Sequence, residues 1–171
     1  MGTPRLRLVQ PSAPAPLKGL YTSGRKRKQS VPTPEWFLDA VCEGFRLPKI
    51  PLDPCAHPNS ARHFALENWT IGGLKRPWER PAYSNPPFKD LLAWLAYARA
   101  EALRTGLMTV FLGPWRSHRI GFCAELAGAE VTWFKAFAFV GHRNKTPFPM
   151  FAATWHCSLP PTPYEVGRKH W

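Results

Sequence analysis

The run Ser84-Asn85-Pro86-Pro87-Phe88 combines residue types that could act together on a planar amine. The Asn85 side-chain oxygen and the Pro86 carbonyl could accept hydrogen bonds from the two N–H groups of a nucleobase amine. Pro86 and Pro87 fix φ, so both acceptors are held in place before the base arrives. Phe88 offers a flat face for stacking. The alternative interpretation is a plain loop, because Asn-Pro and Pro-Pro are frequent in turns.

A carboxylate stands upstream in Leu52-Asp53-Pro54-Cys55-Ala56. The short apolar run 49–53 predicts a buried strand, and residues 82–84 predict the end of another. Ligands of α/β sheets bind beyond the carboxyl ends of the strands. We therefore expect Asp53 and Asn85 to share one edge of the sheet, although 31 residues separate them. Asp-Pro alone is also typical of a turn.

Two helices are expected to flank these strands. Thr33 is a plausible N-cap with Pro34 at the first helical position, and Phe37, Val41 and Phe45 then recur at helical spacing. The second helix begins at Asp90 and ends at Thr105-Gly106. Its apolar side is predicted to comprise Leu91, Leu92, Leu95, Ala98, Ala102 and Leu103.

The C-terminal half predicts further alternation of strands and helices. Residues 107–112 form a continuous apolar run, as in a parallel strand buried on both faces. A short helix is expected from Ser117, then a strand over 130–134 and a final antiparallel pair over 136–140 and 150–155. Residues 57–82 give no clear assignment. The pattern predicts a three-layer α/β fold with a mainly parallel sheet and a terminal antiparallel hairpin.

Positive charge is concentrated at the N-terminus. The formal net charge is +12, of which residues 1–31 carry +7 without an acidic residue. This segment is predicted to be a basic, proline-rich, flexible leader that includes Arg25, Lys26, Arg27 and Lys28. Such a balance favours a polyanionic partner. A solvated basic arm or a nuclear-localisation signal would show the same pattern.

The remaining residues, 32–171, are predicted to form a single domain. Its four cysteines are scattered without a Cys-x-x-Cys pair, so a disulfide framework is not expected. Free thiols are typical of proteins in a reducing cytoplasm. Their spacings match no common zinc pattern, so no metal is expected. No apolar run reaches the ~18 residues of a transmembrane helix, so no membrane partner is expected.

The order and spacing of these motifs resemble the phage DNA N6-adenine methyltransferase family. The resemblance covers about Thr33 to Trp155. The motifs that carry it are Thr33-Pro34, Leu52 to Ala56, Gly73-Leu74 with Trp78, Ser84 to Phe88, and Pro147-Phe148-Pro149. It implies a Rossmann-like class I methyltransferase that uses S-adenosyl-L-methionine and acts on double-stranded DNA in a bacterial host cytoplasm.

The resemblance also implies roles for matching residues. The cofactor would be bound by Thr33, Pro34, Asp53, Pro54 and Cys55. The target adenine, flipped out of the stack, would be held by Asn85, Pro86, Pro87 and Phe88. No separate target-recognition domain fits between or after these motifs. DNA contacts are therefore expected from the leader and from a loop with Arg143, Asn144 and Lys145.

Two other functions remain open at this point. One is a non-catalytic nucleic-acid-binding protein on a methyltransferase scaffold, favoured by the charge and by Gly72, which stands where the family usually has an acidic residue. The other is a methyltransferase for a different planar amine, such as that of cytosine, of adenine in RNA, or of a protein glutamine.

Overall fold

The computed structural model describes residues 32–58, 64–116, 121–140 and 144–171, so the predicted leader lies outside the described residues. Their core is a seven-stranded sheet in the order β2-β1-β3-β4-β6-β5-β7. The strands are β1 (Leu52–Asp53), β2 (Glu67–Asn68), β3 (Ala82–Ser84), β4 (Thr109–Pro114), β5 (Glu130–Phe134), β6 (Met150–Trp155) and β7 (Glu165–His170).

The sheet is mixed, which corrects the expectation of a mainly parallel one. The pairs β1·β2, β1·β3 and β3·β4 are parallel. The pairs β4·β6, β5·β6 and β5·β7 are antiparallel. The parallel half therefore contains β1, which ends at Asp53, and β3, which ends just before Asn85. The antiparallel half extends the sheet on the other side of β4.

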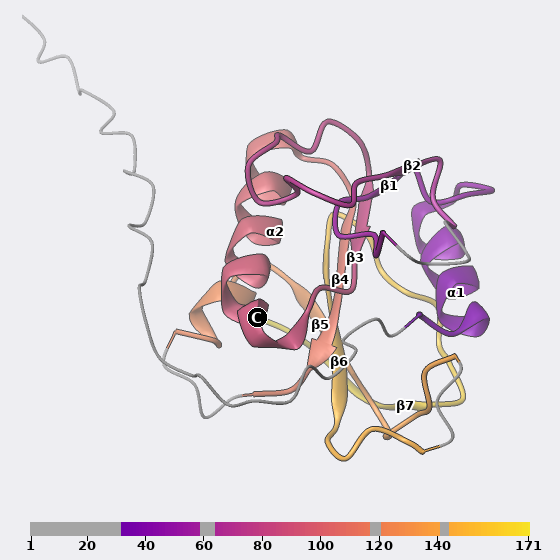
Figure 1. The fold of residues 1–171 in the computed structure, drawn as a ribbon. Helices are drawn as coiled ribbons and strands as arrows, with labels where there is room; N and C mark the ends of the chain where they lie inside the picture. Colours follow the sequence, from indigo (N-terminus) through magenta and orange to yellow (C-terminus); the bar gives the residue numbers. More distant parts are fainter. Residues whose placement is uncertain (1–31, 59–63, 117–120, 141–143) are drawn as a thin grey trace, which may run out of the picture.

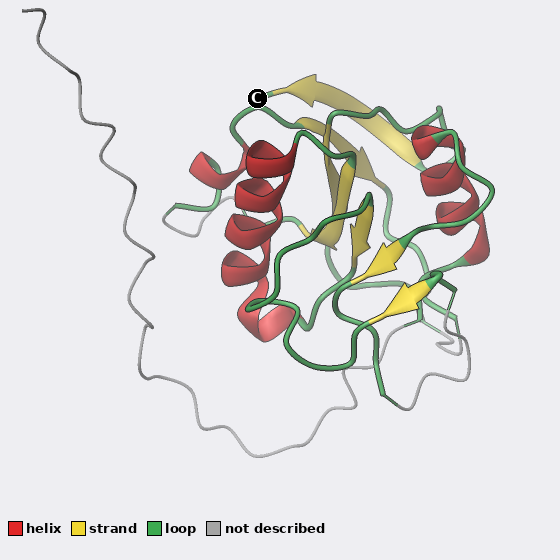
Figure 2. Cartoon of the chain, turned by 90° about the horizontal axis from the view of Figure 1, so that it is seen from above, coloured by secondary structure: helices red, strands yellow, loops and turns green. Residues whose placement is uncertain are grey.

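Helix α1 (Glu35–Phe45) and helix α2 (Leu91–Thr105) cover opposite faces of this sheet (Figure 1), so the view from above shows the sheet between them (Figure 2). Strand β4 shows why both faces must be covered. Val110 and Leu112 pack with the α1 side, while Phe111 between them packs with the α2 side. The continuous apolar run is thus a strand buried on both faces, as predicted.

The first helix begins one residue later than predicted, and Thr33 is not its cap. Pro34 occupies the N-cap position without a side-chain hydrogen bond. The Thr33 hydroxyl instead hydrogen-bonds the Tyr83 hydroxyl. The helix ends at Phe45, and the C-cap residue Arg46 adopts a left-handed φ of 54°. Phe37, Val41 and Phe45 are buried, as their spacing predicts.

The second helix ends where the sequence predicts. A 3-10 turn, η1 (Phe88–Asp90), leads into α2, and Gly106 closes it with a φ of 67°. Leu103 is 54% exposed and does not belong to the buried side. The buried carboxylate of Glu101 takes part in the packing instead.

The C-terminal elements differ most from expectation. Residues 136–140 form no strand, because β6 already pairs with β4 on one side and with β5 on the other. The charged strand β7 was not predicted. Of the helix expected from Ser117, residues 117–120 lie outside the described part, and the 3-10 turn η2 (Ala124–Leu126) follows. None of the described helices has the length and apolarity that crossing a membrane requires.

Candidate functional site

The ends of β1 and β3 bring Asp53, Cys55 and Asn85 together. The two strands are parallel neighbours, with Leu52 opposite Ala82. The backbone of Asn85 hydrogen-bonds the Cys55 sulfur. Residues that are distant in the sequence therefore meet at one edge of the sheet, as expected from the carboxyl ends of parallel strands.

Asp53 is a buried carboxylate that organises the turn after β1. Its Oδ1 accepts hydrogen bonds from the Cys55 backbone amide at 3.0 Å and from the Cys55 thiol at 3.4 Å. Burial and the nearby Asp53 charge raise the pKa of the Cys55 thiol well above its usual value, against the opposing effect of the Asn85 backbone. Cys55 is therefore a neutral thiol at physiological pH, and Asp53 provides the negative charge of this edge.

Thr33 links the segment before α1 to β3. Its Oγ1 lies 2.6 Å from the Tyr83 hydroxyl and accepts a hydrogen bond from Asn85 Nδ2 at 3.3 Å. Burial is the main cause that raises the pKa of Tyr83 well above its usual value, so the phenol keeps its proton. The predicted cofactor residue Thr33 thus contacts the predicted catalytic loop.

The other residues of the Asn-Pro-Pro-Phe loop are also positioned by packing. The Asn85 side-chain oxygen is shielded from solvent in this conformation, and Pro86 is buried. The half-buried ring of Phe88 packs on Phe139 and Phe148, at centroid distances of 6.4 and 5.9 Å. Phe88 is therefore one member of an aromatic cluster and not an isolated stacking face.

The glycine pair upstream packs directly against the Asp53 turn. A Cβ atom on Gly73 would overlap the Pro54 carbonyl oxygen. Gly72 has a φ of 80°, in the left-handed region that favours glycine. A residue with a side chain would be strained at this φ, so the backbone at position 72 favours glycine.

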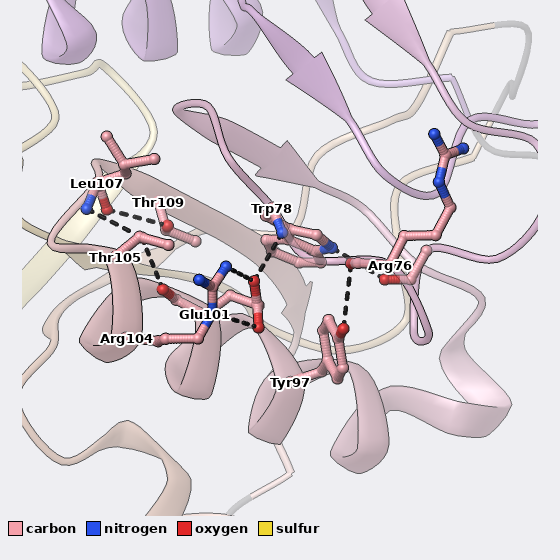
Figure 3. A network of polar contacts seen from close by, with 9 residues as sticks. Arg76, Trp78, Tyr97, Glu101, Arg104, Thr105, Leu107 and Thr109 are labelled. Atoms are coloured by element: carbon pink, nitrogen blue, oxygen red, sulfur yellow. Dashed lines mark hydrogen bonds and ion pairs between the residues drawn. The ribbon is translucent and has the colours of Figure 1, made fainter.

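A buried polar network fixes the loop that contains these glycines to α2 (Figure 3). The Trp78 backbone amide donates to Glu101 Oε2 at 2.6 Å, and the Trp78 indole donates to the Gly73 carbonyl at 2.9 Å. Arg104 contacts the same Glu101 oxygen at 2.6 Å. The loop beside the Asp53 turn is therefore tied to the helix that follows Asn85.

A hollow of about 340 Å³ lies beside β1 and β2, within the size range of small-molecule pockets. None of the residues predicted to hold the cofactor lines it. The lining residues are Leu52, Glu67, Trp69, Arg76, Pro77, Glu79 and Arg80.

The predicted DNA-contacting residues are only partly described. Arg25, Lys26, Arg27, Lys28 and Arg143 lie outside the described residues. Asn144 and Lys145 are exposed, in a loop that leads to Phe148 and so to Phe88.

Sequence reasoning missed Tyr83. The signal was available, because residues i and i+2 of a strand point to the same face and Tyr83 stands two before Asn85. The role of Glu101 could not be read in the same way, since its partner Trp78 lies 23 residues away. Within the described ranges, no group of three potential metal-ligating His, Cys, Asp or Glu side chains is found.

Comparison of the chain with protein-family models, curated proteins and solved structures gives no match.

Proposed function

We propose that this chain transfers a methyl group from S-adenosyl-L-methionine to the N6 amine of adenine in DNA, as a Rossmann-like class I methyltransferase. The observation that carries the proposal is the meeting of Asn85 with Asp53 and Cys55 at the ends of β1 and β3. A stiff amide-bearing loop beside a buried carboxylate suits a planar amine and a cationic methyl donor.

The residues present are compatible with that donor. Asp53 supplies a buried negative charge that would attract a sulfonium or ammonium group, and Pro54 and Cys55 follow it in the same turn. Pro34 follows Thr33, whose hydroxyl contacts Asn85. The cofactor supplies an electrophilic methyl group. With these residues the chain would bind and orient the donor, and no metal is required by the chemistry.

The Asn85 loop would activate the amine. The side-chain oxygen and the Pro86 carbonyl accept its two N–H groups, which favours a more tetrahedral nitrogen with an available lone pair. With the donor held beside this loop, that lone pair would accept the methyl group, and the S–C bonding pair would remain on the neutral sulfur. The surplus proton then leaves the nitrogen for solvent.

This mechanism requires a change at Asn85. Its oxygen is shielded from solvent in the present conformation, so whatever covers it must move before a flipped base can be bound. The same shielding favours a second candidate function, a nucleic-acid-binding protein without catalysis, and the net charge of +12 is compatible with it.

Methyl transfer from a tritiated donor to unmethylated DNA tests the proposal. We expect incorporation by the wild type, and a loss of about 100-fold or more in Asn85→Ala, as for other single transition-state hydrogen bonds. Digestion of the product to nucleosides should yield N6-methyladenosine in its deoxy form. If the methylated nucleoside were a cytosine, or if RNA were methylated in place of DNA, the proposed substrate would be wrong and that amine would replace it.

Calorimetry separates the second candidate. Salt-sensitive DNA binding without any binding of S-adenosyl-L-methionine would contradict the enzymatic proposal and support the non-catalytic one. Activity that survives Asn85→Ala would leave methyl transfer in place but remove the mechanism given for Asn85.

A further inference from the structure

The Asn85 side-chain amide has two ends of nearly equal size and opposite hydrogen-bonding character. Its oxygen accepts hydrogen bonds, whereas its nitrogen donates them. A planar amine presents N–H donors, so it would be repelled if the amide were turned the wrong way. The proposed chemistry therefore depends on which end of the amide faces the base.

The Asn85 amide lies at one end of a hydrogen-bonded chain of three side chains. Asn85 Nδ2 donates to Thr33 Oγ1 at 3.3 Å, and Thr33 Oγ1 lies 2.6 Å from the Tyr83 hydroxyl. With the nitrogen facing Thr33, the threonine oxygen keeps one proton and one lone pair for Tyr83. Either direction of the Thr33–Tyr83 hydrogen bond is then compatible with the amide, whereas a turned amide would allow only one.

The two hydroxyl-bearing residues are themselves well fixed. The Tyr83 ring is fully buried and packs on Phe37 and Phe64, at centroid distances of 5.9 and 5.6 Å. Thr33 is 6% exposed, and the preceding Pro32 carbonyl accepts a hydrogen bond from the Val140 amide at 3.1 Å. The amide nitrogen of Asn85 is thus held by groups with little freedom to move.

We infer that Thr33 and Tyr83 are positioning residues that fix the orientation of the Asn85 amide, with its nitrogen turned toward Thr33. The catalytic consequence rests on the proposed function, whereas the orientation itself does not. Thr33 acts through Asn85 and is not assigned to the cofactor. Tyr83 acts one step further away, by holding the Thr33 hydroxyl.

Conservative variants test the inference because they separate the hydroxyl from the packing. Thr33→Val keeps the shape and removes the acceptor, Thr33→Ser keeps the hydroxyl, and Tyr83→Phe removes only the second hydroxyl. Thr132→Val is the matched control, because Thr132 is also buried and its hydroxyl has no hydrogen-bond partner among the described residues.

The first readout is the pair of Asn85 side-chain amide protons in nitrogen-15 NMR spectra, assigned by its loss in Asn85→Asp. Thr33→Val is expected to shift this pair and to speed its exchange with solvent. Thr33→Ser and Thr132→Val are expected to leave it in place. An Asn85 pair that is unchanged in Thr33→Val would overturn the inference, whether or not the protein has methyltransferase activity.

The second readout is steady-state methyl transfer. Loss of the hydrogen-bond partners that orient metal ligands typically costs about 10–100-fold, and we expect a decrease of similar size in kcat for Thr33→Val, since Thr33 orients Asn85 in the same manner. The kcat of Tyr83→Phe should decrease less, and the kcat of Thr33→Ser should stay close to that of the wild type. The KM for S-adenosyl-L-methionine should change little in all three.

If Thr33→Val raised the KM for S-adenosyl-L-methionine and left kcat unchanged, the positioning role would be overturned. Thr33 would then be assigned to cofactor binding. An inactive wild type would contradict the proposed function, and the NMR result would still decide the orientation of the amide.

Discussion

Gly73 and Pro54, from two separate loops, lie in direct backbone contact beside the Asp53 turn. A Cβ atom on Gly73 would overlap the Pro54 carbonyl oxygen and stand 2.7 Å from the Trp94 ring. The contact needs a residue without a side chain because no space is left for a Cβ atom. The backbone φ of Gly73 is not in the left-handed region and does not itself require glycine. It joins the glycine-containing loop to the end of β1.

Gly73→Ala is therefore expected to lower the free energy of unfolding by about 1–3 kcal/mol, the usual cost of forcing an extra methyl group into a packed region. Urea denaturation measures the change. Gly167→Ala is the control, because no described atom lies within 4 Å of a Cβ atom at Gly167. Equal urea midpoints for the two variants would show that the Gly73 contact is not close in solution.

Glu101 is expected to stabilise the protein through Trp78 more than through Arg104. Glu101→Ala leaves the buried Trp78 amide without its acceptor and should cost about 1–3 kcal/mol. Glu101→Gln keeps an oxygen for that amide and loses only the contact with Arg104, whose side chain is 49% exposed. Because solvent screens the half-exposed Arg104 guanidinium, we expect this ion pair to contribute less than the buried Trp78 hydrogen bond. Thermal unfolding of both variants measures their losses of stability. If Glu101→Gln lost as much stability as Glu101→Ala, the effect would be assigned to the ion pair with Arg104.

Thr132→Val is expected to stabilise the protein or leave its stability unchanged. The Thr132 hydroxyl is buried and lacks a hydrogen-bond partner among the residues described, so replacing it with a methyl group removes a desolvated polar atom. Thr154→Val is the comparison, because the Thr154 hydroxyl donates to the Glu130 carbonyl at 3.2 Å. Its loss should cost about 1 kcal/mol. Chemical denaturation that ranks the two variants in reverse would contradict the assignment.

The Cys157 thiol should make stability fall at alkaline pH. Burial raises the pKa of this thiol from 9.0 to about 12 in the folded protein. Between these values the unfolded chain has lost the proton that the folded chain keeps, so the unfolded state is favoured as pH rises. The slope is at most about 1.4 kcal/mol per pH unit, and the contribution is fully present below pH 9.

Denaturation of Cys157→Ala over the same pH range isolates this contribution. The variant should lose stability less steeply than wild type above pH 9, while the two curves run parallel at lower pH. Parallel curves throughout would mean that Cys157 is accessible to solvent in the folded protein.

Local patterns were sufficient for the elements with strong periodicity. The spacing of Phe37, Val41 and Phe45 predicted the buried side of α1, and Gly106 marked the end of α2. The apolar run of β4 predicted burial on both faces. These features depend on side chains that are close in sequence, so a single sequence contains the information.

Strand pairing could not be predicted in the same way. Strand β6 lies between β4 and β5 and leaves no edge for residues 136–140, whereas β7 pairs with β5 through a charged segment. Arg168 and the buried Glu130 form an ion pair at 2.8 Å that fixes this pairing. The arrangement of the whole sheet decides which strand edges remain free for pairing. The hydropathy pattern of a single segment does not contain this information.

The sequence by itself determined which residue types stand at the ends of β1 and β3, and it predicted that these two ends share one edge of the sheet. Only the tertiary structure decided that Thr33 turns away from its helix to hold Asn85 and Tyr83. A threonine before a helix is equally suited to cap it or to bond elsewhere. The choice depends on which partner the fold brings within hydrogen-bonding distance, and that partner lies 50 residues away.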